Sequence, residues 1–349
     1  MTPLPVDGTV LPWLGAPLQA ALREQRGHAL LVHGAAGAGQ LSFALGLARA
    51  WLCEAAPDAR PGGLACGRCA SCHLTRPDQV HPDLCMLMPE AVHLQIGWWQ
   101  KEDDREKLES ASRKPSEWIR IEQVRAAIEF ATQTRSRALP KVIVIHPAER
   151  LQTIAASALL KLLEEPQGGL RLVLASADAA SLLPTVRSRC QAIALGTPDP
   201  ALAAPWLQEA GLEDADVLLA AAGGQPLAAL DRHAQGLDGA LWRRLPALVA
   251  GGDATPLSRL PLPLAVECLQ KLCHDVLAVS AGAVPRFFPQ ASLVAPPARL
   301  GALSVWGRNL ARAARDATHP WNAPLLLESL LGEGKRALSP GVDSVHSRR

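Results

Sequence analysis

The stretch HGAAGAGQLSFALG, residues 33–46, has the glycine spacing of a phosphate-binding loop, G-x-x-x-x-G from Gly34 to Gly39. The short apolar run before it, 28–33, predicts a buried strand, and the run after it, 40–53, has helical periodicity. A strand, a glycine-rich turn and a helix together present backbone N–H groups at a helix N-terminus, where phosphate groups bind. We therefore expect a nucleotide-site fold here, although an isolated glycine pattern of this kind more often marks only a tight strand–helix turn.

The residues that would make this loop an ATP site are absent. A working loop continues with Lys, which neutralises the phosphates, and with Ser or Thr, whose hydroxyl holds magnesium. Gln40 and Leu41 occupy these two positions, and the apolar run 142–145 ends in His146-Pro147 instead of an acidic pair. We therefore predict a nucleotide-site fold without competent hydrolysis. The degenerate loop comprises Gly34, Gly37, Gly39, Gln40 and Leu41.

The first half of the chain alternates between apolar runs and helical periodicity, which is typical of an α/β fold with a doubly wound parallel sheet. Strands are predicted at 28–33, 83–88, 141–145, 170–175 and 190–195, and helices at 14–25, 40–53, 122–133 and 154–165. The polar stretch 97–118 interrupts this pattern and predicts a surface insertion, whose three tryptophans leave a role in interactions open.

Beyond about residue 197 the strand signal ends and Ala/Leu-rich helical segments follow. We expect a sheet domain at 1–196, a small helical domain at 197–240 and an all-helical bundle at 241–335. The last residues, 336–349, are polar and predict a disordered tail.

Composition limits the functional classes. Apolar residues make up 48% of the 349 residues and the net charge is only +2, so a protein that holds nucleic acid by its own charge alone is disfavoured. No apolar run reaches the length of a membrane span, and the N-terminus lacks the pattern of a signal peptide, so we expect cytoplasmic residence. In that compartment the eight cysteines are not expected to form disulfides.

Three cysteines form the pattern C-x-x-C-x-x-C at Cys66, Cys69 and Cys72. With a fourth thiolate they would form a closed tetrahedral zinc site of the structural kind, and an iron–sulfur cluster is the alternative. Spacing alone leaves Cys53 and Cys85 both open as the fourth ligand. We favour Cys53, because Cys85 falls within an apolar strand, where a cysteine is more simply a buried hydrophobe.

The segment PTVRSRC, 184–190, places two arginines two residues apart at the end of an element. Taken alone, such a pair is most often a solvated edge. Four segments in this order nevertheless resemble the clamp-loader subunits of bacterial DNA polymerase III, which are AAA+ proteins, and most of all the delta-prime type. The segments are HALLVHGAAGAGQ, CGRCASC, ALLKLLEEP and TVRSRC, and the resemblance covers about residues 12–196.

The resemblance implies specific roles for residues of this chain. Zinc would be held by Cys53, Cys66, Cys69 and Cys72, within a module at 53–72. Arg189, in Ser188-Arg189-Cys190, would be an arginine finger that reaches ATP bound by a neighbouring subunit. The helical domains would be a lid and a collar through which the subunits oligomerise.

The resemblance also implies a function without ATP hydrolysis by this chain. The chain would be a stator and finger donor within the DNA-directed DNA polymerase (nucleotidyltransferase) holoenzyme, in the replisome at the nucleoid. Its partners would be the gamma/tau and delta subunits, the sliding clamp (beta) and, through the complex, primed DNA. An active ATPase of the gamma/tau type and a zinc-dependent nucleic-acid-binding regulator remain the alternatives.

Overall fold

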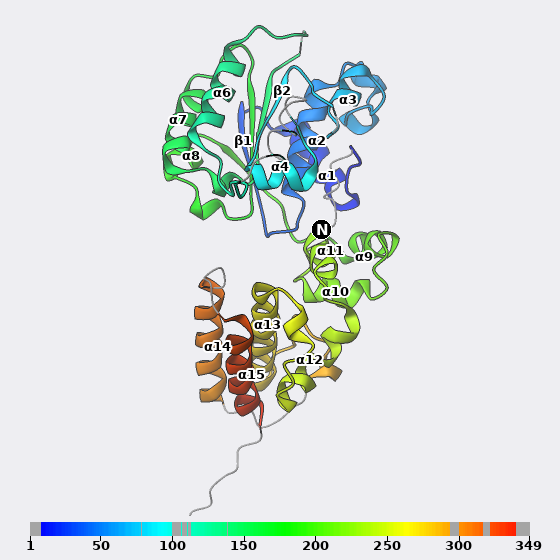
Figure 1. Ribbon diagram of the computed structural model, residues 1–349. Helices are drawn as coiled ribbons and strands as arrows, with labels where there is room; N and C mark the ends of the chain where they lie inside the picture. Colours follow the sequence, from blue (N-terminus) through cyan, green and yellow to red (C-terminus); the bar gives the residue numbers. More distant parts are fainter. Residues whose placement is uncertain are drawn as a thin grey trace, which may run out of the picture. The chain divides into compact units, whose positions relative to one another are not determined.

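The structure of the protein is a computed structural model, which describes residues 8–77, 79–99, 106, 110, 113–137, 139–293, 300–316 and 322–339. The chain divides into two compact units, Met1–Asp199 and Pro200–Arg349 (Figure 1). The first unit contains the sheet, and the second is helical in its described part.

The first unit is built on a five-stranded sheet in the order β2-β3-β4-β1-β5, in which all the pairings are parallel. Its strands are β1 (Ala29–His33), β2 (Leu84–Leu87), β3 (Val142–Ile145), β4 (Arg171–Ser176) and β5 (Gln191–Ala194). The three middle strands are almost wholly buried, as expected for strands that are covered on both faces. The five predicted strands are therefore confirmed to within one or two residues at each end.

Helices cover both faces of this sheet (Figure 1). The helices of the first unit are α1 (Gly15–Glu24), α2 (Gln40–Leu52), α3 (Ala70–Leu74), α4 (Glu90–Ile96), α6 (Ile121–Thr132), α7 (Thr153–Glu164) and α8 (Pro184–Arg187). One buried cluster joins α6, α7 and α8 to the strands, and α2 packs against the strands β3 and β4. The chain moves one way along the sheet from β1 to β2 and the opposite way from β2 through β3 to β4, so right-handed crossovers place α2 on one face and α6 and α7 on the other. The doubly wound α/β class is therefore confirmed.

The second unit contains seven described helices, namely α9 (Pro200–Glu209), α10 (Ala215–Ala221), α11 (Pro226–Ala234), α12 (Gly239–Gly251), α13 (Leu262–Ser280), α14 (Leu300–Arg315) and α15 (Ala323–Leu338). The first three pack on one another, and α13, α14 and α15 form the larger helical group together with α12. The predicted helical character beyond residue 197 is confirmed. The division of this region at residue 240 stays a prediction.

Two predicted segments lie partly outside the described residues. Of the insertion 97–118, the structure describes 97–99, 106, 110 and 113–118. The predicted tail began at residue 336, but α15 continues to Leu338, because Ala337 and Leu338 are buried against the helical unit. The tail prediction was therefore wrong for 336–338, and residues 340–349 lie outside the described part.

Candidate functional site

The glycine loop between β1 and α2 is a compact turn in which two glycines are sterically required. A Cβ on Gly34 would lie 2.7 Å from the carbonyl oxygen of Leu195, so no side chain fits there. Gly39, the residue before α2, has φ +105° and packs against Leu11 and Leu14. The loop therefore has the tight turn expected of a phosphate-binding loop, with α2 beginning directly at Gln40.

The side chain of Gln40 turns back onto its own loop. Its Nε2 donates to the carbonyl oxygens of Gly34 at 2.7 Å and of Ala35 at 2.8 Å, and the residue is only 6% exposed. Leu41 is buried in the hydrophobic core. Gln40 therefore bonds the loop to itself, and Leu41 offers an apolar side chain where a magnesium ligand would stand.

The N-terminal segment also closes on this loop. The indole Nε1 of Trp13 donates to the carbonyl oxygen of Ala38 at 2.9 Å, and Trp13 is buried. Trp13 could not be predicted as part of this site, because no local sequence pattern indicates a hydrogen bond between residues 25 positions apart.

The end of β3 carries a neutral imidazole where an ATPase would have an acidic pair. Burial lowers the pKa of His146 to about 4, so the ring is uncharged at neutral pH. The nearest acid of this segment, Glu149, accepts a hydrogen bond at Oε1 from the backbone N–H of Ala177 at 3.2 Å. Ser176, at the end of β4, is fully buried and its hydroxyl accepts from the N–H of Asp178.

The four cysteines predicted as metal ligands lie together. The Sγ atoms of Cys53, Cys66, Cys69 and Cys72 are all within 4.8 Å of one another, and each cysteine is free of disulfide bonds. Of the two residues considered for the fourth position, the structure brings Cys53 into the cluster, whereas Cys85 is buried in β2.

The donor set fits a tetrahedral ion. The Sγ atoms of Cys66 and Cys72 are 4.0 Å apart, close to the edge of about 3.8 Å that Zn–S bonds of about 2.3 Å would give. Backbone N–H groups donate to two of the sulfurs, from Cys66 to Cys53 and from Cys72 to Cys69, each at 3.4 Å. N–H groups that donate to sulfur stabilise the thiolate form of cysteine, which is the form that binds a metal. The cluster can therefore hold a metal ion.

A buried hydrogen-bond network attaches this cysteine cluster to the sheet unit. The hydroxyl of Ser71, next to Cys72 in the chain, donates to the carbonyl oxygen of Leu52 and lies 2.8 Å from Nε2 of His81. The Nδ1 atom of His81 accepts from the N–H of Asp83, just before β2. No local sequence pattern indicates this network, since its members are joined only by the folding of α3 against the end of α2.

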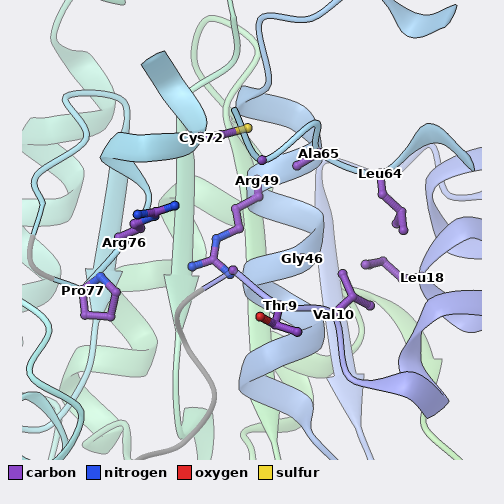
Figure 2. Close-up of a pocket in the computed structure, with 12 residues that line it drawn as sticks. Thr9, Val10, Leu18, Gly46, Arg49, Leu64, Ala65, Cys72, Arg76 and Pro77 are labelled. Carbon is purple, nitrogen blue, oxygen red and sulfur yellow. The ribbon is translucent and has the colours of Figure 1, made fainter. Parts of the chain in front are cut away.

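A pocket of about 450 Å³ separates the cysteine cluster from the N-terminal segment (Figure 2). Arg49 extends into it from α2 and donates to the carbonyl oxygen of Thr75 through Nε at 3.3 Å and Nη2 at 2.9 Å. Cys72 and Gly46 lie in its wall. Arg49 thus links the helix of the glycine loop to the residue that directly follows α3.

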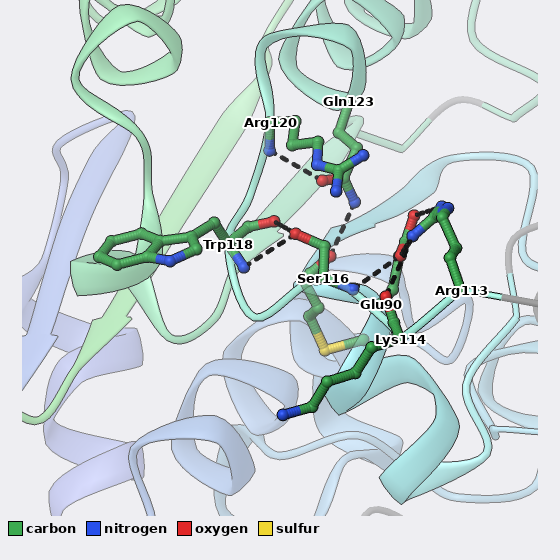
Figure 3. A network of polar contacts seen from close by, with 8 residues as sticks. Glu90, Arg113, Lys114, Ser116, Trp118, Arg120 and Gln123 are labelled. Carbon is green, nitrogen blue, oxygen red and sulfur yellow. Dashed lines mark hydrogen bonds and ion pairs between the residues drawn. The ribbon is translucent and has the colours of Figure 1, made fainter. Parts of the chain in front are cut away.

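The end of the predicted insertion is held by Glu90 at the start of α4 (Figure 3). Its carboxylate accepts from Arg113 at 2.6 and 2.7 Å and from the N–H of Ser116 at 2.8 Å. Arg113 and the backbone N–H of Ser116 together hold the pKa of Glu90 at about 2. Of the tryptophans noted there, Trp98 is buried and Trp118 is 45% exposed.

The segment Ser188-Arg189-Cys190 follows the short helix α8 at the rim of the sheet unit. Cys190 packs against the core cluster of α6, α7 and α8, and burial raises the pKa of its thiol to about 11. Ser188 ends α8 and its hydroxyl donates to the carbonyl oxygen of Thr185. The half-buried Cys190 therefore anchors the segment, while Arg189 stays on the surface.

Arg189 is bonded within its own chain. Its Nη2 is 2.6 Å from Oε1 of Glu164, and its Nη1 donates to the carbonyl oxygen of Thr185 at 3.0 Å. Glu164 belongs to the segment ALLKLLEEP, but no local sequence pattern indicates this ion pair, since the two residues are far apart in sequence.

The described helices include none that is both long and apolar enough to cross a bilayer.

Comparison with known proteins identifies the family to which the chain belongs. Residues 16–199 match the family model described as "DNA polymerase III, delta subunit". The DNA polymerase III subunit delta' of Pseudomonas aeruginosa is 36% identical over 234 residues, which is 65% of this chain and 62% of that protein. The delta' subunit of Haemophilus influenzae is 34% identical over 212 residues, 60% of this chain and 56% of that protein.

A more distant likeness connects the chain to a second subunit type. The DNA polymerase III subunit gamma/tau of Mycobacterium bovis is 31% identical over 175 residues, half of this chain and 25% of that protein. The alignments thus span less than two thirds of each of these relatives. The family model covers more than half of this chain, and the chain therefore belongs to the DNA polymerase III delta subunit family.

Proposed function

We propose that this protein is a non-catalytic, delta-prime-type subunit of the bacterial clamp loader, a stator that donates an arginine finger and has no ATPase of its own. The observation that carries the proposal is Gln40, whose amide bonds the carbonyl oxygens of the glycine loop where an ATPase has a phosphate-binding Lys. A buried Leu41 and a neutral His146 support the same conclusion, because neither supplies a charge to a nucleotide or its magnesium.

Arg189 is the proposed contribution to chemistry. A guanidinium supplied from a neighbouring subunit stabilises the charge that develops on a transferring phosphoryl group, which is commonly worth about 10³–10⁵ in rate. Such a contribution works only when the subunits are docked, so a chain without ATPase activity would still control hydrolysis by its neighbour. Ser188 would hold the segment that carries the finger.

The proposed partners follow from the family and from the gamma/tau likeness. This chain would assemble with gamma/tau and delta subunits in the cytoplasm, and the complex would use ATP on the motor subunits to place the sliding clamp on primed DNA. The proposed metal is zinc, held by Cys53, Cys66, Cys69 and Cys72. It would supply a closed structural cross-link and leave no coordination position for a substrate.

The first test is magnesium-dependent ATP hydrolysis by the purified chain. We expect none above background. Hydrolysis that is lost on Gly39→Val would instead establish the active ATPase alternative, because that substitution blocks the glycine loop.

The second test is Arg189→Ala in a loader reconstituted from this chain with gamma/tau, delta and the clamp. We expect the ATPase stimulated by DNA and clamp to fall by at least tenfold at the interface that this chain serves. Arg187→Ala, two residues away, is the matched control and should retain the wild-type rate. A wild-type rate for Arg189→Ala would exclude the finger role.

A further inference from the structure

We infer that Glu164 is a positioning residue that restrains Arg189 until the phosphate of a neighbouring subunit's nucleotide competes for the guanidinium. The inference rests on the proposed function and adds to it a restraint on the finger, built into the same chain. It starts from the ion pair between Nη2 of Arg189 and Oε1 of Glu164, 2.6 Å apart.

Both terminal nitrogens of the guanidinium are engaged inside the chain. While Nη2 faces Glu164, Nη1 donates to the carbonyl oxygen of Thr185 at 3.0 Å and lies 3.5 Å from Oγ of Ser188. A guanidinium binds an anion best through two parallel N–H groups. Arg189 must therefore leave at least part of this arrangement to grip a phosphate with both nitrogens.

The two ends of the pair are carried by rigid elements. Glu164 is the last residue of α7, and Arg189 lies two residues beyond the end of α8. These helices contact each other, and Leu163 of α7 and Val186 of α8 both belong to the buried core cluster. The separation of the two backbones is thus set by the core, while the side chains, 49% and 37% exposed, are free to change rotamer.

The position of Glu164 at the C-terminal end of α7 explains why it forms an ion pair with Arg189. A carboxylate at a helix C-terminus is disfavoured by the partial negative charge of the last carbonyl groups. Arg189 supplies the compensating positive charge. The neighbouring Glu165 is exposed at the same helix end and has no such ion pair among the described residues, so it offers a matched control.

The strength of the pair suits a restraint that yields to phosphate. An exposed ion pair shifts an equilibrium by at most about fivefold. A nucleoside triphosphate carries several negative charges, and water is partly excluded from a docked interface. Its phosphates therefore compete successfully with one exposed carboxylate for the guanidinium of Arg189. The cost of releasing Arg189 then appears as weaker ATP binding at the neighbouring site, because only the released state is competent.

The test compares Glu164→Gln, Glu165→Gln and Arg189→Ala in the fully assembled loader with clamp and primed DNA. The glutamine keeps the size of the side chain and an acceptor oxygen, but removes the charge. We expect Glu164→Gln to lower the KM for ATP by about two- to fivefold at low ionic strength without changing kcat. The difference should vanish at high ionic strength, where exposed charges are screened. Glu165→Gln should match the wild type under both conditions.

The outcomes separate this inference from the function on which it rests. If Arg189→Ala lowers kcat but Glu164→Gln behaves like Glu165→Gln, the restraint does not exist and the finger role stands. A lower kcat in Glu164→Gln also overturns the inference, since it would make the carboxylate part of the active geometry. If Arg189→Ala retains the wild-type kcat, the finger role fails and the restraint fails with it.

Discussion

At the scale of single residues, the glycine loop shows how one side chain changes the character of a motif. In an ATPase loop the residue after the last glycine reaches outward to phosphate. Here Gln40 reaches inward and satisfies the carbonyl oxygens of Gly34 and Ala35. The loop is thus stabilised by a neutral amide of its own chain.

Gln40→Ala should therefore destabilise the protein even though it removes no catalytic group. Two carbonyl oxygens in a part-buried loop lose their donor, at a cost of about 1–3 kcal/mol in the free energy of unfolding. Urea denaturation measures this loss. Gln152→Ala, at an exposed position without a side-chain cap hydrogen bond, is the control. Equal midpoints for the two variants would show that the Gln40 bonds contribute nothing.

At the scale of elements, two carboxylates with little exposure to solvent, those of Glu90 and Asp275, join segments that are separated along the chain. Glu90 ties α4 to the residues that follow the insertion (Figure 3). In the helical unit, Asp275 of α13 accepts from three successive backbone N–H groups, those of Arg286, Phe287 and Phe288, at 2.7–3.0 Å. In both cases one carboxylate accepts several hydrogen bonds from a non-helical segment and thereby fixes that segment against a helix.

The Glu90 contact should make stability depend on pH in a defined window. The folded-state pKa of about 2 lies below the ordinary value of 4.5, so the ionised carboxylate stabilises the fold above about pH 4.5. That contribution is about 1–2 kcal/mol, since solvent screens the half-exposed Arg113, and it is lost as the pH falls from about 4.5 towards 2. The difference in unfolding free energy between the wild type and Glu90→Gln should therefore shrink over this range. A difference that is constant with pH would contradict the ionic origin of the contact.

Asp275→Ala should weaken the helical unit substantially. It leaves three backbone N–H groups without their acceptor, and hydrogen bonds to a charged group contribute about 1.5–3 kcal/mol each when isolated. Because the loop can relax towards water, we expect a total loss of about 3 kcal/mol in a urea titration. Asp253→Ala removes a single exposed contact to Thr255 and should cost less than about 1 kcal/mol. Similar losses in both variants would refute the special role of Asp275.

At the scale of the whole molecule, the chain consists of two compact units. We therefore expect a change that destabilises one unit to leave the stability of the other unaltered. The cysteine cluster belongs to the first unit, where it joins the end of α2 to α3. A structural metal ion contributes its binding free energy to the fold of the segment that holds it. Metal removal should therefore loosen the sheet unit and leave the helical unit unchanged.

Hydrogen exchange with and without a strong chelator tests this expectation. Elemental analysis of the untreated protein should find about one zinc per chain, and iron or no metal would overturn the zinc proposal. After chelation, amide protection should fall in residues 53–77 and remain unchanged in α13, α14 and α15. Cys69→Ser should reproduce the chelated pattern without chelator, and a loss of protection spread over both units would contradict the local role.

Much of the fold could be predicted because it depends on local patterns. The five strands, the helices α2, α6 and α7, and the glycine loop follow from runs of apolar residues and from glycine spacing, which act over a few neighbouring positions. The tail boundary was misplaced because α15 is extended by burial of Ala337 and Leu338, and burial depends on distant residues.

The residue types of the candidate site were determined by the sequence alone. Gln40, Leu41 and His146 occupy positions where ATP hydrolysis would need charged or hydroxyl groups. The three clustered cysteines predict a metal site from the sequence alone. Only the tertiary structure decided what these groups contact. In the structure Cys53, and not Cys85, lies with the other three cysteines. The Gln40 amide bonds to its own loop, and Arg189 forms an ion pair with Glu164. The physical reason is that residue chemistry is local, whereas a contact between distant residues exists only once packing of the core has brought their elements together.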